Sequence, residues 1–186
     1  MKKATVNGQE ISGEAVGFEL DRLVRFYMSH GMTTEEVRKN LPKLEEKALE
    51  QAIGAKLLLD RASQIELPVT AADVDAEVQK VIAQIGSEQD YRKALAAQHI
   101  TEAEFRKELE KGARVNMLVA QACSHVQDPT EEEVAAFYEV NKSGWGGQTL
   151  VDVHDKVKDL LRHEARGRAV EAFVEELREK AVIEYK

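Results

Sequence analysis

The chain has 186 residues, a formal net charge of −8, and 43% hydrophobic and 32% charged residues. This composition supplies enough apolar side chains for a folded core and excludes a disordered chain, and the absence of a basic stripe argues against a nucleic-acid partner. The single cysteine, Cys123, excludes an internal disulfide, and no run approaches the roughly 18 apolar residues that a membrane-spanning helix needs.

The two ends of the chain have strand character in a sequence that is otherwise helical. The N-terminal stretch ATVNGQEIS contains Asn7-Gly8, a pair that favours a tight turn, and the C-terminal stretch VIEYK is rich in residues that prefer strands. A lone strand would leave its backbone groups without partners. We therefore expect Val182–Tyr185 to lie beside Thr5–Val6 or Glu10–Ile11 in a small sheet.

Between the ends, capping signals repeatedly precede apolar stripes at helical spacing. A Ser or Thr followed three residues later by Asp or Glu starts most of these segments. Pro42 should kink or restart the second helix in its first turns. There is no α/β alternation and no fixed-period repeat, so the predicted fold class is all-α. The predicted helices are approximately 13–29, 33–62, 70–85, 87–95, 101–117, 130–141 and 149–177.

The stretch NKSGWGGQTL interrupts this pattern at residues 141–150 and contains the only tryptophan. It could be a phosphate-binding loop, a plain linker, or the place where a segment is absent. Its glycines lack the Lys-Ser/Thr end of a phosphate loop and follow no strand, so nucleotide binding is not predicted. The acidic cluster at 130–133 is explained by its place in a first helical turn.

The sequence predicts neither a metal site nor a cofactor. None of the five histidines has the spacing of a zinc-binding helix, and Cys123 has no second cysteine to share a metal. No arrangement of serine, histidine and acid stands out from chance. Cys123 lies in an apolar run, which is typical of a buried and unreactive thiol.

Five stretches, in order along the chain, resemble the SurA/PrsA-type chaperones, the parvulin-associated foldases of bacteria. ATVNGQEIS is similar to the N-terminal strand and turn of that family. LEEKALEQAIGAKLLLDRASQIELPVTAADVDAEV resembles its helix–break–helix, and SEQDYRKALAAQHITEAEFRKELEKGARVNMLV resembles the next two helices. DPTEEEVAAFYEVN is similar to the segment before the isomerase domain. VHDKVKDLLRHEARGRAVEAFVEELREKAVIEY resembles the helix and strand that follow that domain.

The resemblance implies a SurA N-terminal-like helical module, with a two-stranded pairing of its ends, formed by residues 1–186. Residues 1–141 would be its first part, 142–149 a glycine-rich linker, and 150–186 the returning helix and strand. In relatives a parvulin isomerase domain lies at that linker. Here Asn141–Thr149 has nine residues, whereas a domain needs at least about 50. The parvulin landmark motifs are absent too, so we predict that the chain is not an enzyme, whether the domain was lost naturally or removed.

The resemblance implies an ATP-independent holdase or foldase that binds unfolded or nascent polypeptides in an apolar helical cradle, without prolyl isomerase activity. The alternative is a dedicated accessory factor, NifM-like, for one partner protein. A cradle needs adaptable apolar and aromatic groups that the core does not use. Phe26, Met28 and Met32 are preferred because they lie off the main stripe, at the end of the first helix and in the turn after it. The full set of candidates is Phe18, Phe26, Met28, Met32, Phe105, Met117, Phe137, Tyr138 and Trp145.

The resemblance also implies a periplasmic or cell-envelope location. MKKATVNG has a basic start without an apolar stretch, so the sequence itself predicts no secretion signal and a cytoplasmic location stays open. The acidic exterior should favour clients that are not strongly acidic, and neither nucleic acid nor membrane insertion is expected. A homodimer that exchanges helices is predicted, with hinges at Gly31–Thr34 and Asn141–Thr149.

Overall fold

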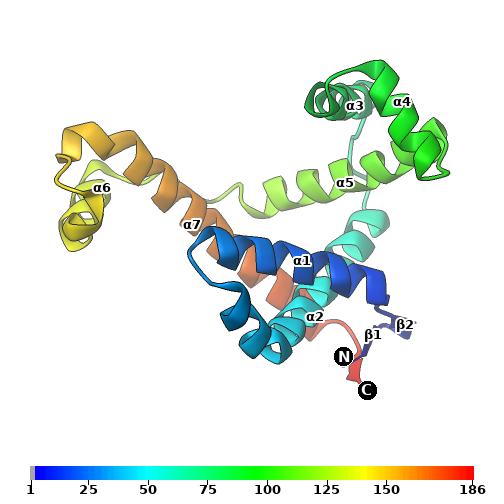
Figure 1. Cartoon of the computed structure of the whole chain (residues 1–186), viewed down its shortest axis with the longest axis horizontal. Helices are drawn as coiled ribbons and strands as arrows, with labels where there is room; N and C mark the ends of the chain where they lie inside the picture. The colour runs from blue at the N-terminus through cyan, green and yellow to red at the C-terminus, as the bar shows by residue number, and fades with distance from the viewer. Residues whose placement is uncertain (1–2) are drawn as a thin grey trace. The chain divides into compact units, whose positions relative to one another are not determined.

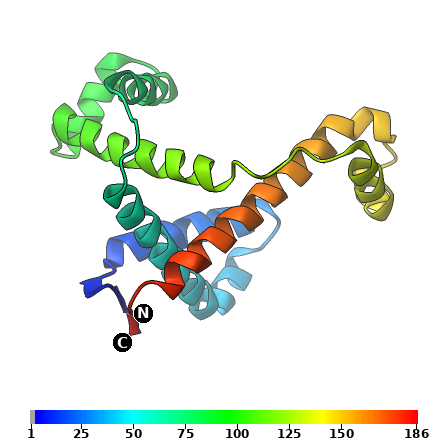
Figure 2. The same ribbon diagram turned by 180° about the vertical axis from the view of Figure 1, so that it is seen from behind.

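The computed structural model describes residues 3–186 and confirms the all-α prediction, with seven α-helices and one small sheet in that range (Figures 1 and 2). The chain divides into two compact units. Unit 1 comprises the residues up to Leu118 together with Glu176–Lys186, and unit 2 comprises Val119–Glu175. The prediction that residues 1–186 act as one module stays a prediction.

The predicted pairing of the chain ends is confirmed. Strand β3 (Ile183–Tyr185) runs antiparallel to β1 (Ala4–Val6), with Val6 opposite Ile183, and the backbone N–H of Lys3 donates to the carbonyl of Lys186. The sheet has a third strand, β2 (Gln9–Glu10), on the other edge of β1. It forms because Asn7 (φ 50°) and Gly8 (φ 79°) close a tight hairpin turn with two positive φ angles.

Helices α1 (Gly13–Ser29) and α2 (Thr34–Gln64) supply most of the unit 1 core. The Ser12 hydroxyl caps α1, and Thr33 with Glu36 forms the predicted capping box of α2. α2 is continuous through Pro42, so the expected restart is wrong; several buried residues follow the proline, and their packing outweighs one lost hydrogen bond. The core residues are Ala4, Val6, Ile11, Val16, Leu23, Ala48, Leu49, Ala52, Ile53 and Leu57.

Three further helices of unit 1 begin as predicted: α3 (Ala71–Ile85), α4 (Glu88–Ala97) and α5 (Glu102–Ala122), which ends five residues beyond its predicted end at 117 and continues past Leu118 into unit 2. They share a separate small core. Buried Val78, Tyr91 and Leu95 lie at its centre, and partly buried apolar side chains of α3 and α5 pack around them. The local capping residues therefore place each helix, and the apolar stripes decide which faces meet.

Unit 2 is a hairpin of α6 (Glu131–Val140) and α7 (Leu150–Glu179), whose last residues belong to unit 1. The glycine stretch connects them through the short 3-10 helix η1 (Lys142–Trp145). Gly146 and Gly147 follow with φ angles of 58° and 84°, which favour glycine. The connection packs onto the hairpin, since Trp145 and other partly buried side chains cover a core of Val134, Tyr138, Val153 and Val157.

Candidate functional site

Unit 1 carries an apolar groove of about 400 Å³, here called the α1–α2 groove. Two of its lining residues are large apolar side chains that solvent reaches, Phe18 (65% exposed) and Leu59 (41% exposed). Its lining residues are Glu10, Ile11, Ser12, Ala15, Phe18, Glu19, Ala52, Ala55, Lys56 and Leu59.

A buried carboxylate lies in the wall of the α1–α2 groove. Glu19 is only 7% exposed, although it is charged. Its Oε2 lies 2.8 Å from Nη2 of Arg22, as an ion pair without hydrogen-bond geometry. The carboxylate therefore keeps capacity to accept a hydrogen bond. Lys56, another charged residue of the lining, already pairs with Asp60.

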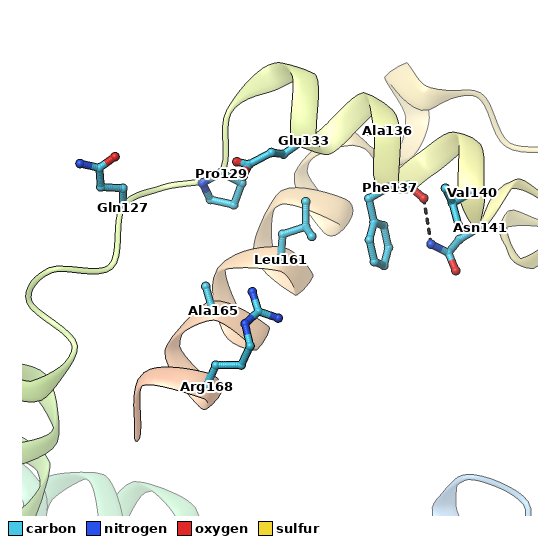
Figure 3. Close-up of a pocket in the computed structure, with 10 residues that line it drawn as sticks. All are labelled: Gln127, Pro129, Glu133, Ala136, Phe137, Val140, Asn141, Leu161, Ala165 and Arg168. Atoms are coloured by element: carbon cyan, nitrogen blue, oxygen red, sulfur yellow. Dashed lines mark hydrogen bonds between the residues drawn. The ribbon is translucent and has the colours of Figure 1, made fainter. Parts of the chain in front are cut away.

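Unit 2 carries a second apolar groove of about 500 Å³, the α6–α7 groove (Figure 3). Leu161 and Ala165 line it from α7, and the Phe137 ring points toward it from α6. Val140, at the end of α6, is 83% exposed. The full lining is Gln127, Pro129, Glu133, Ala136, Phe137, Val140, Asn141, Leu161, Ala165 and Arg168.

The polar side chains of the α6–α7 groove differ in whether they already have hydrogen-bond partners within the protein. Glu133 accepts a hydrogen bond from the backbone N–H of Thr130 as part of a capping box. The Asn141 amide donates to the backbone carbonyl of Phe137, which the dashed line in Figure 3 marks. Arg168 is 70% exposed in its side chain, and its contact with Glu164 is long, at 3.9 Å. The guanidinium therefore has N–H groups that can donate hydrogen bonds to a ligand.

Ion pairs fasten α6 and the segment before it to α7. His154 Nε2 lies 2.6 Å from a carboxylate oxygen of Glu131, and Lys158 contacts the same carboxylate at 3.2 Å. The hydrogen bond with Glu131 raises the pKa of His154 above its usual value, with a second contribution from Asp155. In addition, Arg162 donates to Asp128 at 2.8 Å. The walls of the α6–α7 groove are thus held in place before anything binds.

The three preferred candidates of the sequence lie outside both grooves. Phe26 is 54% and Met28 45% exposed, and Met32 is half-buried. Residues two apart on a helix point about 200° away from each other, so Phe26 and Met28 face different sides of α1. Phe26 instead lies over the ring of His30, at 4.2 Å between centroids. Their role in client binding stays a prediction.

Other candidates divide between groove and core. Phe18 and Phe137 line the grooves. Phe105 packs against the Tyr91 ring, and Tyr138 is 5% exposed with its hydroxyl donating to the Gln148 carbonyl at 2.8 Å. Tyr138 therefore belongs to the core of unit 2 rather than to an open surface. Partly buried Trp145 packs on that core, and Met117 is half-buried in α5.

Sequence reasoning missed the residues that shape the grooves, namely Leu59, Glu19, Val140, Leu161 and Arg168. Val140 carried one signal, because it is an apolar residue directly before the break after α6. Glu19 carried none, since an acidic residue within a helix is normally solvated. No cluster of three or more histidine, cysteine or acidic side chains able to hold a metal occurs within residues 3–186. No helix in the same range is long and apolar enough to cross a bilayer.

The fold is that of a helical module with open apolar grooves. The sequence model of the SurA-like N-terminal domain family matches residues 2–119. The chain belongs to this family, as the resemblance of its five stretches predicted. The match covers most of unit 1. Membership supports a chaperone role.

Two similar proteins extend the comparison beyond that domain. The foldase protein PrsA of Clostridium acetobutylicum is 26% identical over 175 residues, which cover 92% of this chain and 51% of the relative. The chain thus spans about half the length of this relative. A solved structure, from work on two related SurA-like chaperones of Campylobacter jejuni, has a TM-score of 0.59 and 14% identity, and the match covers 99% of this chain and 98% of that one. At this identity the likeness concerns the fold.

Proposed function

We propose that this protein is an ATP-independent chaperone that binds unfolded polypeptide segments. The observation that carries the proposal is the α1–α2 groove, an apolar surface with exposed Phe18 and Leu59 in a domain of the SurA-like family. Large apolar side chains grouped on a soluble protein typically mark a binding surface. Binding would be mainly hydrophobic and of modest affinity, because a disordered client loses conformational entropy when it is ordered.

The proposal includes the absence of prolyl isomerase activity. The connection between α6 and α7 consists of η1 and a few flanking residues, and Trp145 packs it against the hairpin core. A parvulin domain of the relatives would lie at this connection, and no domain fits into it. We also propose a location outside the cytoplasm, in the periplasm or cell envelope, which the SurA/PrsA-type relatives support.

The test combines two assays on the whole chain. Aggregation of several unrelated unfolded proteins is followed with and without the chain, and cis–trans exchange of a proline peptide is measured in parallel. We expect suppression of aggregation for most clients and no acceleration of exchange. Protection of one client alone would favour the dedicated accessory factor instead, and protection of none would refute the chaperone proposal.

Variants assign the client surface within this test. Phe18→Ser should weaken aggregation suppression while leaving the melting temperature nearly unchanged, because Phe18 is 65% exposed. Val151→Ser is a matched control, since Val151 is an 87% exposed apolar residue that lines neither groove. The triple change of Phe26, Met28 and Met32 to Ser tests the preferred candidates of the sequence. If only the triple variant weakens suppression, the client surface lies at the end of α1.

The homodimer with exchanged helices remains a prediction of its own. Sedimentation at micromolar concentration measures the mass directly. A monomer mass there would count against the exchange, without bearing on the chaperone proposal.

A further inference from the structure

We infer that the α6–α7 groove selects client segments in which an aliphatic or aromatic side chain is followed closely by an acidic one. The inference rests on the proposed chaperone function and names the kind of segment that this second site would take. It concerns unit 2 alone, and all lining residues of the groove belong to that unit.

The apolar part of the recognition comes from Phe137, Val140 and Leu161. Val140 is 83% exposed, so a bound segment would remove most of its surface from water. Phe137 and Leu161 are partly buried and pack on the hairpin core, which leaves one side of each for a ligand. Burial of such surface stabilises a complex in proportion to the apolar area removed from water. A client without a large apolar side chain would gain little here.

The charge preference comes from Arg168, the one cation among the described residues that line the groove. Its guanidinium is mostly exposed, and its ion-pair contact within residues 3–186 is the long one with Glu164. A planar guanidinium pairs with a carboxylate through two parallel hydrogen bonds, so an Asp or Glu side chain is its best partner. The acidic group in the groove lining, Glu133, is at the capping box that starts α6, where it accepts from Thr130. Arg168 therefore offers the client's carboxylate a partner that the protein does not already occupy.

The groove is preformed, which favours selectivity. The pairs of His154 with Glu131 and of Arg162 with Asp128 join α6 and its preceding segment to α7. A site whose walls are already ordered loses less entropy on binding, so small differences between ligands are preserved in the affinity. An exposed charge pair contributes modestly, so the preference should be measurable rather than absolute.

The test uses three labelled short peptides of equal length whose central residues are Leu-Asp-Phe, Leu-Lys-Phe or Leu-Ser-Phe. Fluorescence anisotropy with the whole chain measures their affinities at low salt. We expect the Asp peptide to bind roughly three- to tenfold more tightly than the Lys peptide, an advantage that shrinks as salt is added. Arg168→Glu should reverse the order of these two peptides. Val140→Ser should weaken all three, and Val151→Ser should change none.

Several outcomes would overturn the inference. If Arg168→Glu leaves the ratio of the Asp-peptide and Lys-peptide affinities unchanged, the charge preference is refuted. If Val140→Ser binds all three peptides as tightly as the unchanged chain, the α6–α7 groove is not the binding site. A dimer that Val140→Ser dissociates would show that a second copy occupies the groove. Circular dichroism melts of each variant exclude loss of fold as the cause. The two proposals fail separately: aggregation suppression without a charge preference refutes this inference alone, and a charge preference without aggregation suppression refutes the chaperone function alone.

Discussion

The α1–α2 groove and the α6–α7 groove are both apolar but differ in the charge that each presents. The first contains the buried carboxylate of Glu19, and the second is bordered by the exposed guanidinium of Arg168. One acidic chain therefore has two apolar grooves whose nearest charges are of opposite sign. Net charge therefore describes the whole exterior, whereas the charge preference at a groove depends on the side chains that a ligand would contact. Salt screens charges that are farther away than about 10 Å.

The grooves also differ in what supports them. The α1–α2 groove lies on a core of ten buried residues from β1, α1, α2 and the turn between strand and helix. The α6–α7 groove lies on four buried residues, Val134, Tyr138, Val153 and Val157, reinforced by ion pairs at the surface. The stability of unit 2 should therefore depend more on surface charges and on pH than the stability of unit 1 does.

The largest effect on stability is expected from shortening one buried side chain in each of the two cores, in separate variants. Ile53 and Val157 are both fully buried. Ile53→Ala should destabilise unit 1 by about 2–5 kcal/mol, and Val157→Ala should destabilise unit 2 by about 2 kcal/mol. Trp145 is the only tryptophan and lies in unit 2, so its fluorescence reports that unit during denaturation. Val157→Ala should shift the fluorescence midpoint, and Ile53→Ala should shift only the midpoint seen by circular dichroism.

Equal shifts of both signals by both variants would contradict this expectation. The chain would then unfold as one cooperative body, and the distinction between a strongly and a weakly supported groove would lose its basis.

The next effect concerns the start of α6. Thr130 caps this helix by accepting from the backbone N–H of Glu133. Thr130→Ala should lower the stability of unit 2 by about 1 kcal/mol. Thr33→Ala, which removes the matching capping box of α2, is the control in unit 1. Only the first should move the Trp145 fluorescence midpoint in urea.

A smaller effect is expected from the charge in the α1–α2 groove. Glu19→Gln keeps the size of the side chain and removes its negative charge. It should lower the affinity for the Leu-Lys-Phe peptide by roughly threefold and leave the Leu-Asp-Phe peptide bound as before. Anisotropy in the Val140→Ser background isolates the α1–α2 groove, because that change weakens binding of all three peptides to the α6–α7 groove. Identical affinities for the Lys peptide before and after the change would show that Glu19 is structural only.

The smallest effect concerns pH and His154. Because the carboxylate of Glu131 raises the pKa of His154, the folded state holds a proton that the unfolded state releases at lower pH. The resulting stabilisation is fully present below the unfolded pKa, near 6.5, and is lost as pH rises through the folded pKa. The urea midpoint reported by Trp145 fluorescence should therefore decrease as the pH is raised from about 6 to about 8. His154→Gln should flatten this dependence; an unchanged slope would mean that another group is responsible.

Sequence reasoning predicted the helices well because their signals are local. Thr33, Thr70 and Thr130 form capping boxes in the structure, each within three residues of its partner acid. The pairing of the chain ends was predicted by a similar local argument, from backbone groups that needed partners. The third strand was missed, although Asn7-Gly8 indicated the turn, because β2 has only two residues and little strand character.

The client surface was harder to predict, and the neighbouring residues Phe137 and Tyr138 show why. Both are aromatic, and both belong to the same helical segment. Tyr138 faces α7 and is buried with its hydroxyl bonded, whereas Phe137 lies one residue earlier and lines the α6–α7 groove. Successive residues of a helix differ in direction by about 100°, so the choice depends on where the second helix lies.

The amino-acid sequence is enough to predict the all-α class, the helix starts, the meeting of the two ends and the family, since each depends on short-range signals or on their order along the chain. Which apolar side chains stay open to solvent depends instead on how the helices pack. Burial is a property of partners that are distant in sequence, as Glu19 and Leu59 from different helices demonstrate in one groove. A groove exists where the packing of two helices stops, and no local pattern records that point.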